Sequence, residues 1–169
     1  CTLATALTYW RTAMTKILMT VFALAALMAV PAAAELAYVF EAELTGDQVV
    51  PATGSGAGGV ASIILNEAMT MANYTVSFAG LEGGAQTAGH FHLAMAGENG
   101  PVVYDLGTGT PVSGMWEPTA EEAQALMDGN IYVQIHTEGF PGGEIRGQFV
   151  QTAVGTESES LSNIKALFR

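Results

Sequence analysis

Histidine spacing is the feature of this sequence that points most directly to chemistry. Two of the three histidines, His90 and His92, lie two residues apart in the segment GHFHL. If this segment forms a β-strand, both imidazoles project from one face of the sheet, because successive side chains alternate between the two faces. His136 ends an apolar run that begins at Ile131, and it should lie on the polar face of its own strand. If the two strands are neighbours, three imidazoles converge on one point.

Imidazole nitrogen is a common ligand of Cu(II) and Zn(II), and two histidines on a strand plus a distant third are a recurring way to hold either ion. We therefore predict a metal site built from His90, His92 and His136. A purely structural role is the alternative. In that case the ring N–H groups donate to nearby carbonyl oxygens and fix loops to the sheet without a metal.

Arg146 stands out because it is the only arginine or lysine between Lys16 and Lys165, and it falls inside a predicted strand. Such a side chain should have a partner, either a carboxylate such as Glu144 on the same strand face or a pair of carbonyl oxygens. We interpret Arg146 as the organiser of the turn Pro141-Gly142-Gly143. Binding of an anionic substrate is the alternative.

The composition narrows the range of functions. The chain has 16 acidic residues against 5 lysines and arginines, and its formal net charge is −11. Such a charge repels phosphate backbones and anionic membranes but attracts cations, so we expect no nucleic-acid partner. Nucleophilic catalysis is not predicted either, because the chain lacks a G-x-S-x-G motif and its single cysteine is Cys1. We therefore assign no catalytic residues.

The N-terminal region has the pattern of a secretory signal peptide. Lys16 precedes an apolar run, residues 17–30, that ends in Pro-Ala-Ala-Ala. We predict a signal peptide at 14–34, cleaved after Ala34, and export to the periplasm or the medium. The run is too short to span a membrane, and we expect no membrane-spanning segment in the protein after cleavage. Residues 1–13 lack an initiator methionine and are predicted to be upstream or mis-started sequence.

Glycine spacing predicts an all-β fold that would position these residues. All 20 glycines follow residue 45 and separate short apolar segments at intervals of roughly ten residues, which is typical of an all-β sandwich or barrel. One short helix is predicted at 119–127, where Thr119 and Glu122 can form a capping box. We predict one domain over 35–152, a flexible tail over 153–169, and strands at 38–44, 60–65, 72–78, 90–94, 102–104, 131–136 and 144–150.

Several motifs together resemble the CHRD domain, a module named after chordin and widespread in secreted bacterial proteins. The resemblance covers about 37–151 and is strongest in the closing run from YVQIHT to PGGEIRGQ; it also includes ELTG, VP, AGHFH, GPVV and LMDGNI. It implies a secreted, immunoglobulin-like antiparallel β-sandwich with no established catalytic activity. In chordin the domain accompanies domains that bind growth factors, which implies an extracellular protein partner here.

The segment His90-Phe91-His92 is also similar to the copper-ligand strand of Cu,Zn superoxide dismutases, which are β-sandwiches too. The disulfide cysteines and the zinc loop of those enzymes are missing from this chain. We therefore interpret the protein as a secreted binding or interaction module that holds copper or zinc. A copper-dependent redox enzyme and a structural envelope or matrix protein are the alternatives.

Overall fold

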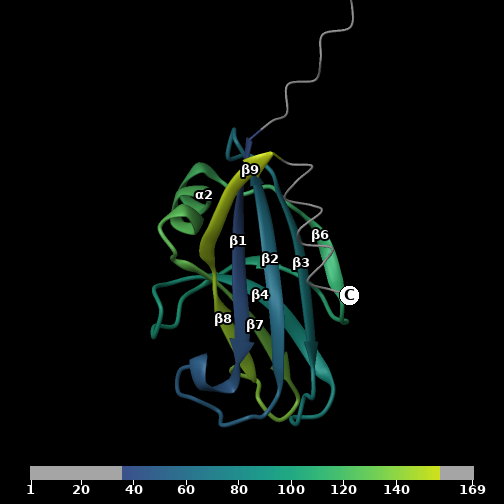
Figure 1. Ribbon diagram of the computed structural model, residues 1–169. Coiled ribbons are helices and arrows are strands. Elements are labelled where there is room, and N and C mark those ends of the chain that lie inside the picture. Colours follow the sequence, from purple (N-terminus) through teal and green to yellow (C-terminus); the bar gives the residue numbers. More distant parts are fainter. Residues whose placement is uncertain (1–35, 157–169) are drawn as a thin grey trace, which may run out of the picture. The chain divides into compact units, whose positions relative to one another are not determined.

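The computed structural model describes residues 36–156 (Figure 1). The predicted upstream segment, the signal peptide and the part of the predicted tail beyond residue 156 lie outside this range. Within residues 36–156, no helix is both long enough and apolar enough to cross a membrane.

The fold of the described region is all-β, as predicted. Nine strands form one antiparallel sheet, and they are joined by a short 3-10 helix, η1 (Gly46–Gln48), and an α-helix, α2 (Ala120–Met127). The strands are β1 (Leu36–Thr45), β2 (Gly58–Asn66), β3 (Ala72–Ala79), β4 (Gln86–Leu93), β5 (Val102–Asp105), β6 (Val112–Trp116), β7 (Ile131–Thr137), β8 (Ile145–Gln148) and β9 (Val150–Thr156).

The sheet folds over on itself into a sandwich. Its strand order is β5-β4-β7-β8-β1-β2-β3-β6, and β9 also pairs with β1. Figure 1 shows β1, β2 and β3 in the layer in front of β4 and β7. The two ends of the sheet meet where the Tyr104 hydroxyl on β5 donates to the carbonyl oxygen of Met115 on β6, at 3.0 Å.

Strand alternation determines which side chains fill the space between the layers. Along β3, which contains the predicted strand at 72–78, every second residue from Ala72 to Phe78 is buried. On β4, Phe91 is fully buried and contacts the ring of Phe149 edge-on, with centroids 5.5 Å apart. His90 and His92 flank Phe91 on this strand, so their side chains must point to the outer face of that layer.

The predicted capping box is present at the start of α2. The Glu122 amide donates to the Thr119 hydroxyl at 3.2 Å, and the Thr119 amide donates to the Glu122 carboxylate at 2.9 Å. Two backbone amides that have no partner within the helix thus gain hydrogen bonds. Ala123 and Leu126 are the buried residues on the inner side of the helix.

Thr119→Ala should lower the free energy of unfolding by about 1 kcal/mol, because the variant loses the capping oxygen. Urea denaturation monitored by circular dichroism measures this change. Thr119→Ser keeps the oxygen and should retain most of the stability; equal losses in both variants would show that the methyl group matters rather than the cap.

One strand was not predicted from the sequence. The sequence predicts no strand between residue 104 and the helix at 119–127. The structure shows β6 there, paired along β3 with Tyr74 opposite Gly114. Only Trp116, which is 2% exposed, is fully buried on β6, and Val112 packs against the core while partly exposed, so the apolar alternation of β6 is too weak to recognise.

The end of the domain also differs from the prediction. Residues 144–150 were predicted to form one strand, but strand β8 ends at Gln148 and β9 begins at Val150. Phe149, between them, places its ring in the core. β9 then pairs with β1 as far as Thr156 opposite Leu36. Residues 153–156, which the sequence assigned to the tail, are therefore part of the sheet.

Candidate metal centre

The three histidines lie on two adjacent antiparallel strands. In the ladder between β4 and β7, His90 is opposite Gln134, His92 is opposite Tyr132, and Ala88 is opposite His136. The register therefore places the three imidazoles side by side on the outer face, as predicted if the strands were neighbours.

The rings are close enough to share one ion. One candidate ligand atom from each histidine lies within 4.8 Å of the other two. The ring centroid of His90 is 5.1 Å from that of His136 and 5.5 Å from that of His92. Metal–nitrogen bonds of about 2.0–2.1 Å place the ligand nitrogens of a tetrahedral site about 3.4 Å apart, so closure shortens each nitrogen–nitrogen distance by at most about 1.5 Å.

Hydrogen bonds orient two of the rings. The Nδ1 of His92 lies 3.0 Å from the carbonyl oxygen of Gly100, and the Nδ1 of His136 lies 3.0 Å from that of Pro141. A carbonyl oxygen only accepts, so in each neutral ring the proton is on Nδ1 and Nε2 carries a lone pair. Such bonds fix the tautomer of a metal-binding histidine and raise its basicity.

Three of the four remaining ring nitrogens are buried and have no hydrogen-bond partner within the described region. They are Nδ1 of His90, Nε2 of His92 and Nε2 of His136. A buried polar atom without a partner costs free energy, and native proteins contain few of them. Three in one cluster, one from each ring, fit a metal ion as the missing partner.

The surroundings favour the neutral, ligand-ready form of two histidines. Burial lowers the pKa of His92, and the charges of His90, His136 and Arg146 lower it further against the effect of the bond to Gly100. Burial also lowers the pKa of His136, with a contribution from His90, against the bond to Pro141. Less competition from protons makes a site easier to load with metal.

Two carbonyl groups of the turn after β7 hold side chains of that strand. The carbonyl oxygen of Pro141 accepts from Nδ1 of His136, and the carbonyl oxygen of Gly142 accepts from the side-chain amide of Gln134. Gly143 has a φ of +114°, and the Gln134 side chain occupies the place of a Cβ atom there. A side chain at this position would displace Gln134 from the same sheet face as the histidines.

Arg146 does not organise this turn, and it does not pair with Glu144, which corrects the sequence interpretation. Its guanidinium donates to the carbonyl oxygens of Glu98 at 2.7 Å and Met95 at 3.1 Å, and to the side chain of Gln148 at 2.9 Å. The carbonyl-binding role was predicted, but it serves the loop between β4 and β5. This loop also contains the carbonyl partner of His92.

Glu144 occupies a different environment. Its carboxylate accepts hydrogen bonds from the hydroxyls of Ser55 and Thr137 and from the amides of Glu82 and Gly83. These contacts join three segments at the lower end of the sandwich in Figure 1. Local spacing gave no signal for this cluster, because its members come from distant parts of the chain.

Tyr132 completes the surroundings of the histidines. Its ring stacks on His92 with centroids 4.8 Å apart and an interplanar angle of 7°. Its hydroxyl accepts a hydrogen bond from the Gly100 amide at 3.2 Å. Tyr132 lies four residues before His136 and so shares its strand face, but the stacking depends on the strand register and could not be predicted.

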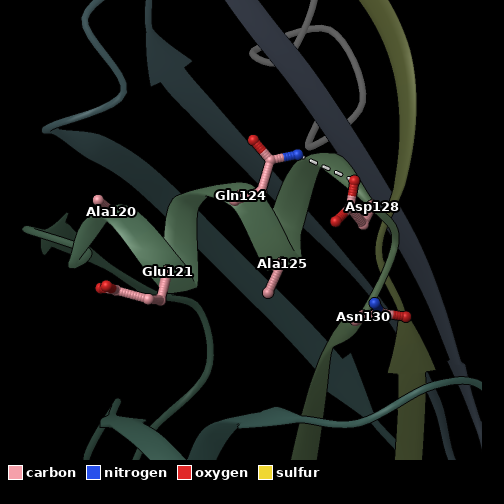
Figure 2. Close-up of a pocket in the computed structure, with 6 residues that line it drawn as sticks. All are labelled: Ala120, Glu121, Gln124, Ala125, Asp128 and Asn130. Carbon is pink, nitrogen blue, oxygen red and sulfur yellow. Dashed lines mark hydrogen bonds between the residues drawn. The ribbon is translucent and has the colours of Figure 1, made fainter.

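A groove beside α2 is separate from this cluster. Figure 2 shows its lining, where the Gln124 amide donates to Asp128 at 2.9 Å. None of the three histidines lines it. The groove residues are Ala120, Glu121, Gln124, Ala125, Asp128 and Asn130.

Two comparisons with known proteins bear on the resemblance seen in the sequence. The comparison with curated proteins found no match. The family model of the CHRD domain matches residues 40–149, which is more than half of the chain and includes all three histidines. The chain therefore belongs to the CHRD domain family.

Proposed function

We propose that this chain is an exported CHRD-domain module that binds one Cu(II) or Zn(II) ion through His90, His92 and His136. The observation that carries the proposal is the group of three buried ring nitrogens that have no partner among residues 36–156. A purely structural role explains the Nδ1 bonds of His92 and His136. It does not explain why one nitrogen of each ring is buried without a partner among residues 36–156, because that arrangement costs free energy unless something binds these nitrogens.

Copper should bind more tightly than zinc. Three neutral imidazoles form a nitrogen-only ligand set, and the affinity of such sites for divalent ions peaks at Cu(II). The negative charge of the chain, −11, should also raise the local concentration of cations.

A copper-dependent redox enzyme of superoxide dismutase type is the second candidate. Three protein ligands leave one coordination position for water or a small substrate, which is the arrangement of catalytic rather than structural metal sites. Turnover of superoxide by the copper-loaded protein would support the enzyme. Tight binding without turnover would support metal storage or delivery.

Export is part of the proposal and rests on the pattern at 14–34 and on family membership. The protein recovered outside the cytoplasm should begin at Glu35, which mass spectrometry of the mature chain can test. An extracellular protein partner or an envelope role would fit the same location.

Titration of the tag-free protein with Cu(II) in competition with glycine tests metal binding. We expect one ion per chain and a loss of affinity of more than about 100-fold in His92→Ala, since even supporting residues of metal sites contribute 10–100-fold. Asp105→Asn is the matched control, because Asp105 lies opposite His90 in the ladder but offers a carboxylate rather than an imidazole. Weak binding that is equal in all three proteins would contradict the proposal.

A further inference from the structure

Arg146 is a buried positive charge whose hydrogen-bond acceptors are all neutral. The side chain is 1% exposed, and it donates to two backbone carbonyls and the amide oxygen of Gln148. Among residues 36–156, no carboxylate oxygen lies within 4.0 Å of the guanidinium nitrogens. Burying a charge without a counter-charge is costly, so its retention at this place needs a reason.

The charge is held next to the metal centre by a stack of three side chains. The guanidinium carbon lies 3.5 Å from the centroid of the Tyr132 ring, and the ring of His92 stacks on Tyr132 at 4.8 Å. Because β7 lies between β4 and β8 in the sheet, Tyr132 separates the guanidinium from the imidazole. No water can enter between stacked planar groups at these distances, so the charge is poorly screened in this direction.

The guanidinium charge repels any cation that the three histidines hold, because only the ring of Tyr132 lies between it and the imidazole of His92. This repulsion grows in proportion to the charge of the bound ion. At roughly 8–10 Å and an effective dielectric constant of about 20, one unit of charge changes a binding constant by about tenfold or more.

We propose that Arg146, acting across Tyr132, makes the three-histidine site favour Cu(I) over Cu(II) and so raises the reduction potential of the bound copper. This inference rests on the proposed copper binding. It assigns Arg146 a positioning and electrostatic role, since the guanidinium touches no ligand atom. The protein would then be adapted to hold or exchange reduced copper, and Zn(II), which has no monovalent form, would be disfavoured together with Cu(II).

The test compares two variants that both lose the planar fork of hydrogen bonds but differ in charge. Arg146→Met keeps an apolar stem against Tyr132 and removes the charge, whereas Arg146→Lys keeps the charge. Cu(I) affinity is measured without oxygen in competition with bicinchoninate, and Cu(II) affinity in competition with glycine. We expect the ratio of Cu(I) to Cu(II) affinity to fall about tenfold in Arg146→Met, equivalent to about 59 mV. In Arg146→Lys the ratio should stay within about threefold of wild type.

The outcomes separate this inference from the metal site itself. Wild-type protein that binds neither copper ion at the histidines would end both proposals. Binding with an unchanged ratio in Arg146→Met, or with an equal fall in both variants, would leave the site intact and overturn the role of the charge. If Arg146→Met does not fold, the same affinity ratio is measured in Gln148→Glu. This substitution places a carboxylate where Arg146 now donates to an amide oxygen, so it offsets the guanidinium charge. A similar fall in the ratio supports the inference, and an unchanged ratio overturns it.

Discussion

Saturating Cu(II) should raise the unfolding temperature of the wild-type chain by on the order of 10 °C and leave that of His92→Ala nearly unchanged. A ligand present at about 1,000 times its Kd stabilises the native state by about 4 kcal/mol. The ion would hold β4 to β7 at three points, and two of its ligands are bound through Nδ1 to the Gly100 and Pro141 carbonyls. An unfolded chain does not keep these histidines together, so nearly all of the binding energy favours the folded state.

Scanning calorimetry with and without metal measures this shift within each variant, which removes any effect of the substitution on the metal-free protein. Zn(II) should give a smaller rise than Cu(II). A chelator should restore the original transition. Equal rises in wild type and His92→Ala would mean that Cu(II) binds to scattered carboxylates, and the three-histidine site would then be abandoned.

The local part of this site could be predicted from the sequence. The pattern around Phe91 fixes which way His90 and His92 point, because side chains alternate along any strand. The same holds for His136 beside Ile135. The convergence itself required β4 and β7 to be neighbours with a particular register, and a shift by one residue would have moved His136 to the core face. Strand alternation does not specify pairing partners, so convergence remained conditional until the structure was known.

The buried polar residues show where prediction from sequence failed. Glu144 and Arg146 are two residues apart and opposite in charge, which suggested an ion pair. In the structure each finds partners on segments distant in sequence. Amides and hydroxyls donate to the Glu144 carboxylate, and the Arg146 guanidinium donates to carbonyl oxygens, so several hydrogen bonds replace the lost water for each buried group. Loop conformation determines these partners, and no local pattern encodes it.

Glu144 is the residue whose replacement should destabilise the domain most clearly. It is fully buried, and each carboxylate oxygen accepts one backbone amide and one hydroxyl. Burial raises the pKa of Glu144, but the bonds from Glu82, Thr137, Ser55 and Gly83 outweigh it and hold the pKa below its ordinary value. The folded state therefore stabilises the ionised carboxylate.

Glu144→Gln should lower the free energy of unfolding at pH 7 by about 3 kcal/mol. A glutamine amide has one oxygen and one NH2 group, and either orientation places the NH2 group against a backbone N–H, that of Glu82 or that of Gly83. The hydroxyls of Ser55 and Thr137 can rotate to accept, but the backbone amides cannot. Urea denaturation measures the loss, and Glu121→Gln, an exposed carboxylate on α2, should change little.

The pH dependence of the difference identifies the carboxylate as its source. Since the pKa of Glu144 is lowered in the folded state, its stabilising contribution is fully present above the ordinary value of 4.5 and is lost as the pH falls through the folded value. The gap in stability between wild type and Glu144→Gln should therefore be constant from about pH 7 to pH 5 and narrow below that. A gap of the same size at every pH would mean that the substitution acts through packing, because an uncharged contact has no proton to gain.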